Sequence, residues 1–225
     1  MSVLKTEGII VHTLKFKDTD QIATVFTPQE GLLKFLIKRA YTSKHGKGSH
    51  SALLTRAEIV YSKGKADLHL CQEMSPLNAH PHLRDNLPLL EASFDLLKSI
   101  RASQVPNRPA EPLYLLLQMT LERLHHLPDP WTAPLSMRLK ILRDEGVFHP
   151  SSNCALCHTP LATHCLFQGE SYCRAHSPPL ATEFSQEEYT LLTHLAQAHS
   201  WGDLSVSLPL YFAPKIIDIF NDHFQ

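Results

Sequence analysis

The sequence contains no uninterrupted apolar run of about 18 residues, the length that a membrane-spanning helix needs. The N-terminal stretch MSVLKTEGIIVHTLKF places an acidic residue and several basic ones inside its apolar run, so it matches a signal peptide poorly. We therefore expect a protein of the cytoplasm, where thiols stay reduced, with no membrane partner.

Several signatures of enzymes are also missing. The G-K-G at residues 46–48 is too short for a phosphate-binding loop and lacks the Walker spacing. There is no G-x-S-x-G nucleophile elbow, and the H-x-E…P-C-x-x-C pattern of zinc deaminases is absent. No other set of side chains assembles into a catalytic group, so we predict that the protein is not an enzyme.

What the sequence does contain is an ordinary globular composition, 43% hydrophobic and 19% charged, with an uneven distribution of charge. Residues 1–65 hold eleven Lys and Arg against five acids, a net charge of +6, and the remainder has a net charge of −7. One end of the chain can therefore attract polyanions, whereas the rest as a whole cannot.

The first part of the chain is rich in β-branched and aromatic residues. Runs of this kind at 7–16, 21–27 and 32–41, followed by two more within 55–74, predict five short strands. In the third run, Leu33, Phe35 and Ile37 alternate with Lys34, Leu36 and Lys38, as the two faces of a strand require. Five short strands predict a small barrel or a sandwich, and the positive charge of the segment favours an OB-type barrel.

Apolar residues at helical spacing predict helices in the later part of the chain, at 87–102, 109–127, 133–146, 185–199 and 209–224. The fourth begins with a capping box, Ser185 to Glu188, and the last is expected to be interrupted by Pro214. The predicted class is α+β: an OB-fold nucleic-acid-binding domain at residues 1–78, then a helical domain at 79–149 and 181–225. A zinc-ribbon-like knuckle at 150–180 is inserted in the helical domain.

Four of the five cysteines fall within twenty residues. The pattern is Cys154-x2-Cys157, fifteen residues, then Cys173-x2-His176. Two ligands three apart can lie on one tight turn, so each pair provides one edge of a tetrahedron. The spacing predicts a structural Zn²⁺, because four protein ligands leave no open position for catalysis.

Other interpretations of these residues stay open. C-x-x-C-H is also the signature of haem attachment, and a redox dithiol or an unmetallated remnant is a further alternative. Three neighbours compete as zinc ligands: His158, His164 and Cys165.

The positive charge suggests contacts to single-stranded nucleic acid. Candidate phosphate contacts lie on and after the third strand and in the following loop: Lys34, Lys38, Arg39, Lys44 and Lys47. Tyr41 is the candidate for stacking on a base, whereas Phe16 and Phe35 are expected in the core. The alternative is that the lysines only keep a strand edge from aggregating.

The order of these parts resembles the RecO family of bacterial recombination mediators. The resemblance rests on DTD at 18–20, VFTPQEG at 25–31 and IKRAYTSKHGKG at 37–48, followed by a leucine-rich helical region that leads into C-x-x-C. Many zinc-bearing members have a fourth cysteine where this chain has His176.

The resemblance implies a barrel that binds single- and double-stranded DNA and anneals complementary strands coated by single-strand-binding protein. It also implies action with RecR in loading the recombinase RecA at gaps and breaks. The C-terminal tail of single-strand-binding protein would dock on the helical domain, and the protein would act near the bacterial nucleoid. Two alternatives are a zinc-containing protein–protein adaptor that does not bind DNA and a metal-dependent enzyme.

Overall fold

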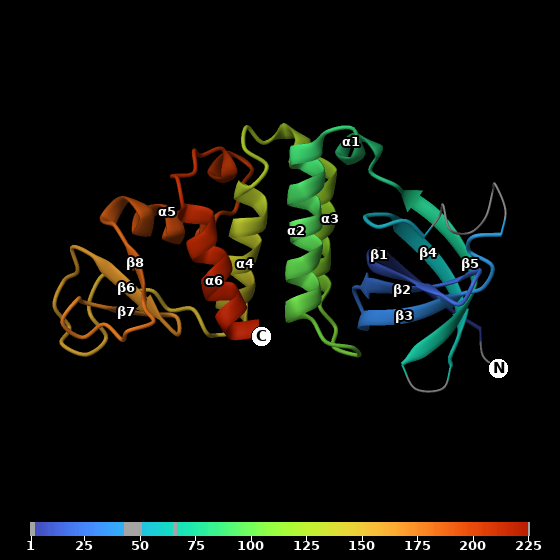
Figure 1. Ribbon diagram of the computed structural model, residues 1–225, viewed down its shortest axis with the longest axis horizontal. Helices are drawn as coiled ribbons and strands as arrows, with labels where there is room; N and C mark the ends of the chain where they lie inside the picture. Colours follow the sequence, from blue (N-terminus) through green and yellow to red (C-terminus); the bar gives the residue numbers. More distant parts are fainter. Residues whose placement is uncertain (1–2, 43–50, 65–66, 225) are drawn as a thin grey trace. The chain divides into compact units, whose positions relative to one another are not determined.

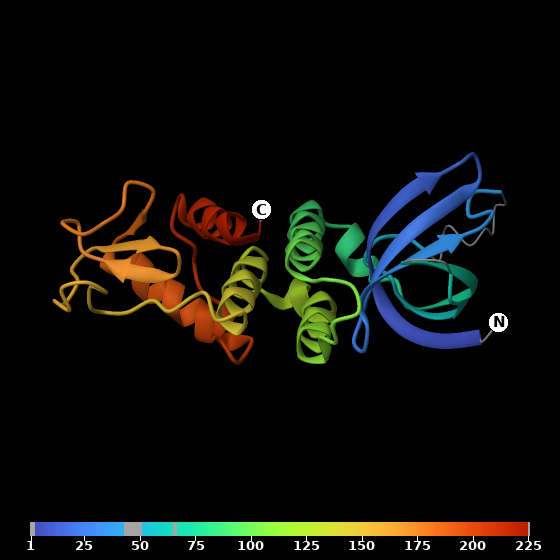
Figure 2. The same cartoon turned by 90° about the horizontal axis from the view of Figure 1, so that it is seen from below.

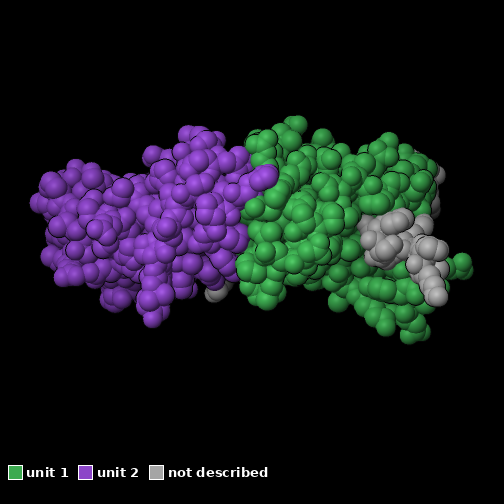
Figure 3. All heavy atoms as spheres, turned by 90° about the horizontal axis from the view of Figure 1, so that it is seen from above, with its two compact units in different colours: residues 1–125 green, residues 126–225 purple. Residues whose placement is uncertain are grey.

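The computed structural model describes residues 3–42, 51–64 and 67–224. Contacts divide the chain into two compact units, residues 1–125 and 126–225, which Figure 3 colours separately. The predicted α+β class, with an OB-type barrel at the N-terminus followed by helices, is confirmed. The division into domains at residues 78, 149 and 180 stays a prediction. No helix in the described ranges is long and apolar enough to cross a bilayer.

The first unit is built on a closed barrel with strand order β1-β2-β3-β5-β4 (Figure 1). The strands are β1 (Val3–Phe16), β2 (Asp20–Thr27), β3 (Gly31–Ile37), β4 (Arg56–Ser62) and β5 (Leu68–Asn78). Only β3 and β5 pair in parallel, and every other neighbouring pair is antiparallel. This is the strand order of a five-stranded OB barrel.

Strand β1 closes the barrel because it pairs on both sides. Its first half, from Val3 to Ile9, pairs with β4, and its second half, from Ile9 to Phe16, pairs with β2. The register with β2 shifts between Ile10 and His12, at a β-bulge. A bulge bends a strand and increases its twist, and Figure 2 shows β1 curving sharply around the barrel.

The alternation expected in β3 is confirmed. Leu33, Phe35 and Ile37 are buried in the barrel core, and Lys34 is exposed. The Phe35 ring packs edge-on against Tyr61 at 5.2 Å between centroids. Phe16, in contrast, was expected in the core but is only partly buried and lies outside it.

Helices α1 (Pro81–Arg84), α2 (Leu87–Ser103) and α3 (Glu111–Arg123) belong to the same unit. The segment between α2 and α3 is fixed to the β2–β3 turn, because Asn107 N donates to Glu30 O at 2.9 Å and Ala110 N to Pro28 O at 3.0 Å. These helices therefore cover the barrel end that holds the β2–β3 turn.

The second unit contains α4 (Thr132–Asp144), α5 (Gln186–Gln197) and α6 (Phe212–Phe224), with α4 packed on both others. The short 3-10 helices are η1 (Leu124–His126), at the boundary of the units, and η2 (Gly202–Leu204). The capping box predicted at Ser185 and Glu188 is present. Pro214 does not interrupt α6, because it lies in the first turn, where a missing N–H costs nothing.

A small sheet of order β7-β6-β8 completes the second unit and carries Cys154, Cys157 and Cys173 on its flanking loops. Its strands are β6 (His164–Phe167), β7 (Glu170–Tyr172) and β8 (Thr182–Phe184). Gln168 and Gly169 form a two-residue turn between β6 and β7 with φ values of 48° and 81°, as a type I′ hairpin needs. The sequence did not reveal these strands, because three or four residues are too short for a visible alternation.

Candidate functional site

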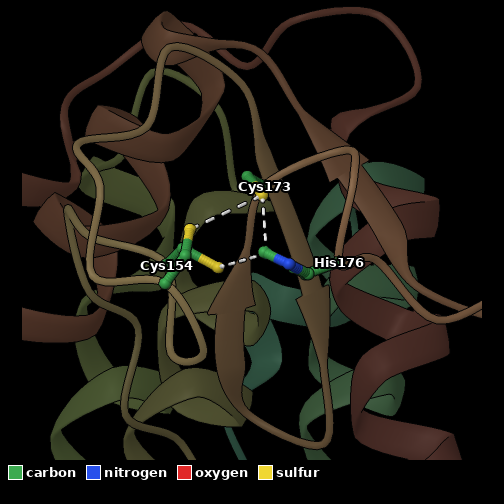
Figure 4. A group of neighbouring side chains, drawn as sticks. Cys154, Cys173 and His176 are labelled. Atoms are coloured by element: carbon green, nitrogen blue, oxygen red, sulfur yellow. Dashed lines mark hydrogen bonds between the residues drawn. The ribbon is translucent and has the colours of Figure 1, made fainter.

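The structure brings together the four residues that the cysteine spacing singled out. Cys154 and Cys157 lie on one turn, where Cys154 N donates to Thr159 O and His158 N donates to Cys154 O, each at 2.9 Å. Cys173 and His176 lie on a second turn, closed by His176 N donating to Cys173 O at 3.0 Å. The four ligand atoms lie within 4.8 Å of one another. Figure 4 shows Cys154, Cys173 and His176 pointing toward a common centre.

The distances between ligand atoms match a tetrahedral metal site. Cys173 Sγ lies 3.3 Å from His176 Nδ1, Cys154 Sγ lies 3.8 Å from the same nitrogen, and Cys157 Sγ lies 4.0 Å from Cys173 Sγ. A tetrahedral Zn²⁺ with ordinary bond lengths would separate two sulfurs by about 3.8 Å and a sulfur from a nitrogen by about 3.5 Å. The donor set of three sulfurs and one nitrogen is also one that structural zinc uses.

The local backbone favours the ligating form of two of the thiols. Hydrogen bonding from the Cys157 N–H, with other N–H groups of the turns, lowers the pKa of the Cys154 thiol to about 5. Hydrogen bonds from Thr159 lower the pKa of the Cys157 thiol. Burial raises the pKa of Cys173 instead, so this third thiolate needs a nearby cation to form at neutral pH.

The competing ligands lie outside this group. His158 is exposed on the first turn with φ of 57°. His164 is buried and stacked on Tyr189, with 3.5 Å between ring centroids, and its Nε2 lies 3.2 Å from Gln186 Oε1. Cys165 is buried in β6. The group of four ligand atoms found in the described part of the chain therefore contains none of these three residues.

The candidate DNA contacts that the structure describes lie along β3 and just after it: Lys34 is in the strand, and Lys38, Arg39 and Tyr41 follow its end, which is opposite the β2–β3 turn. Lys34, Lys38 and Arg39 are exposed on and just after β3, and Tyr41 is 51% exposed. Lys44 and Lys47 lie outside the described residues.

Two cations that the sequence reading missed lie at the same end of the barrel. Lys15 and Lys17 are exposed at the end of β1, and the Lys17 ammonium lies 5.4 Å from the centre of the Phe16 ring. Tyr41 N donates to Thr19 O at 3.1 Å, which holds the residues after β3 against the β1–β2 turn. The sequence signal for these two cations was that lysines flank Phe16 immediately before the turn at residues 18–20.

Comparison with known proteins identifies the family. The family model for the N-terminal part of recombination protein O matches residues 1–80, and the model for the C-terminal part matches residues 88–210. DNA repair protein RecO of Chlamydia pneumoniae is 26% identical over 224 residues, which cover 95% of this chain and 86% of that protein.

Other relatives are matched over less of their length. DNA repair protein RecO of Moorella thermoacetica is 25% identical over 71% of this chain and 59% of its own length, and that of Nostoc punctiforme is 27% identical over 74% and 53%. This chain therefore spans less than two thirds of both proteins. Among solved structures, asparaginyl-tRNA synthetase of Entamoeba histolytica aligns with a TM-score of 0.31 at 12% identity, over 73% of this chain and 36% of that one, and supports no argument. The two family models together match most of the chain, which therefore belongs to the RecO family of DNA repair proteins.

Proposed function

We propose that this chain is a DNA-binding recombination mediator that acts without catalysing a reaction. It binds single- and double-stranded DNA through exposed cations of its barrel and anneals complementary strands coated by single-strand-binding protein. With RecR it assists the loading of RecA at gaps and breaks. The observation that carries this proposal is a group of five exposed cations on β1, on β3 and just after these strands, which form no ion pair among the described residues: Lys15, Lys17, Lys34, Lys38 and Arg39.

Charge explains how such a surface would promote annealing. Two single strands repel one another through their phosphates, and this repulsion opposes the approach that base pairing needs. Cations that neutralise phosphates of both strands release condensed counterions and lower the barrier to that approach. The other side of the barrel is less suited, because Lys5 pairs with Glu58 at 2.7 Å and Arg56 Nη1 lies 3.4 Å from Glu7 Oε1.

For the four-residue cluster we propose a structural Zn²⁺ bound by Cys154, Cys157, Cys173 and His176. Its function would be to hold two turns together in a region of short strands that has a small core of its own. The support is the tetrahedral spacing of the ligand atoms and the lowered thiol pKa values on the first turn.

Membership in the family supports the proposed partners. We propose that the acidic tail of single-strand-binding protein docks on the helical part of the chain, and that the protein acts in the cytoplasm near the nucleoid. No described residue is assigned to that docking.

An annealing assay tests the proposed function. Complementary oligonucleotides coated by single-strand-binding protein are mixed with wild-type protein, with K34A/K38A, or with K98A/R123A, which removes two exposed cations from α2 and α3. We expect acceleration by wild type and K98A/R123A and a clear loss with K34A/K38A. If wild-type protein has no affinity for DNA at low salt, the chain is an adaptor and the proposal is wrong.

A further inference from the structure

The outer face of the barrel carries a row of aliphatic side chains that crosses four strands. The register pairs Leu14 of β1 with Ile22 of β2, Ile22 with Leu36 of β3, and Leu36 with Leu70 of β5. Directly paired residues point to the same side of a sheet, so the four side chains form one line. We call these four residues the aliphatic row. With strands spaced about 4.8 Å apart, the row is about 14 Å long.

The aliphatic row belongs to the outside of the barrel. On β2 and β3 its neighbours along the strand are buried, as Phe35 and Ile37 beside Leu36 show, and none of the four belongs to the buried barrel core. Leu14 is 55% exposed, and the other three are partly exposed. The water-exposed parts of these aliphatic side chains would gain free energy from contact with an apolar partner.

Polar and cationic positions border the aliphatic row on both sides. Two positions from the row, toward the β2–β3 turn, His12 pairs with Thr24 and Thr24 with Lys34. Burial, with the nearby Arg101 charge, lowers the pKa of His12, so the positive charge on this side comes from Lys34 and the exposed Arg101.

On the other side of the row, Phe16 pairs with Asp20, and the Asp20 carboxylate accepts a hydrogen bond from Arg39 N at 2.9 Å. The exposed side chains of Lys38 and Tyr41 are close by in the chain. The aliphatic row therefore lies between Lys34 on one side and a group of cations and aromatic rings on the other.

We propose that the aliphatic row receives the faces of unpaired nucleobases while Lys34 and Lys38 bind the phosphates at its margins. This inference rests on the proposed function and specifies it, because it assigns the face to single strands in preference to duplex. A duplex keeps its base faces stacked inside, so it can offer this surface only its phosphates. Cations on both margins of an apolar line suit a polyanion with apolar bases better than the apolar surface of a protein.

The row also fits annealing. Its four side chains have no hydrogen-bond donor or acceptor, so they contact bases without regard to sequence. Because apolar contact covers the face of a base, the edge that pairs with a second strand stays free. A surface that hydrogen-bonded those edges would compete with the complementary strand.

The test compares an oligothymidylate, an abasic single strand of the same length and a duplex as ligands for the full chain. Wild-type protein should prefer oligothymidylate to the abasic strand. L14S/L36S should lose about tenfold in affinity for oligothymidylate, the size of losing one base contact, and should bind the abasic strand and the duplex like wild type. The salt dependence of binding should not change, because no phosphate contact is removed.

Two further variants control the test. Leu77 is 47% exposed on β5 outside the row, so L77S should bind like wild type. L14F should retain the preference for bases, because an aromatic ring also contacts a base face. Equal affinity of L14S/L36S and wild type for oligothymidylate would overturn the inference and leave the row as a surface for a protein. An equal loss for all three ligands would overturn it too, because the row would then only support the fold. If K34A/K38A also bound DNA like wild type, the proposed function itself would fail.

Discussion

The backbone N–H of Arg39 donates a hydrogen bond of 2.9 Å to the carboxylate of Asp20. This bond fixes the basic residues that follow β3 next to the turn between β1 and β2. Asp20 therefore has two opposed effects on DNA binding: it positions cations, and its own negative charge repels phosphates.

Two substitutions at Asp20 separate these effects. D20N keeps an oxygen that can accept from Arg39 N and removes the charge, so we expect single-strand affinity to rise about twofold to fivefold. D20A removes the acceptor as well, so the gain should shrink or reverse. Fluorescence anisotropy with a labelled oligonucleotide measures both. Weaker binding by D20N than by D20A would contradict this account of Asp20.

The sequence predicted those features of the fold and the site that depend on residues close together in the chain. Strand alternation in β3, the capping box at Ser185 and the spacing of the Cys154 and Cys173 pairs each depend on residues close in the chain. The aliphatic row was not visible, because it exists only through the register of four strands, one of which pairs in parallel across a long connection. The one indication in the sequence was that Leu36 shares its strand face with Lys34 and Lys38.

Gly31 provides a test of how the helices are fixed to the barrel. It has φ of 63°, and a Cβ there would meet Val105 O at 2.7 Å and Arg108 O at 2.6 Å. We expect G31A to destabilise the protein by at least about 3 kcal/mol, since the left-handed conformation and the clash with backbone both disfavour it. Thermal unfolding measures the loss, and hydrogen exchange should place it in β2, β3 and α3.

Gly146 is the matched control for Gly31. Its φ is 72°, but a Cβ there would meet nothing within 4 Å. G146A should therefore lose only about 1 to 2 kcal/mol of stability, the cost of the left-handed backbone conformation. If the two variants lost equal stability, the contact between the β2–β3 turn and the α2–α3 segment would be unimportant.

His80 makes stability depend on pH. The ring is fully buried with Nδ1 2.9 Å from Leu54 O, and burial lowers its pKa from 6.5. The pKa of His80 is therefore lower in the folded protein than in the unfolded chain, where it is about 6.5. The neutral ring contributes its full stabilisation above pH 6.5, and this contribution is lost as the pH falls through the pKa of the folded protein. The stability of wild type should therefore fall more than that of H80N, which does not titrate, as the pH drops below about 6.5.

Asn is a suitable replacement because it tolerates the φ of 46° found at His80. H199N, at an exposed histidine, should follow wild type. Unfolding by denaturant at several pH values gives the comparison. Parallel pH profiles for wild type and H80N would show that His80 does not contribute to the dependence.

Removing the metal should affect one region. If the four-residue cluster binds Zn²⁺, a chelator should release about one equivalent and expose the amides of β6, β7 and the two turns to hydrogen exchange. The amides of the barrel should stay protected. C157S should lose the metal, whereas C71S, which changes a buried cysteine in the barrel, should keep it. A folded chain purified with less than about half an equivalent of metal would argue against the site.

The proposed function depends on exposed cations of the barrel, Lys34 and Lys38 among them, binding the phosphates of single-stranded DNA. The most direct measurement is the salt dependence of single-strand affinity for wild type, K34A/K38A and K98A/R123A. If Lys34 and Lys38 each contact a phosphate, the slope of log K against log salt should become shallower by about 1.4 for K34A/K38A, about 0.7 per lost contact, and should stay unchanged for K98A/R123A. Identical slopes for all three proteins would contradict the claim.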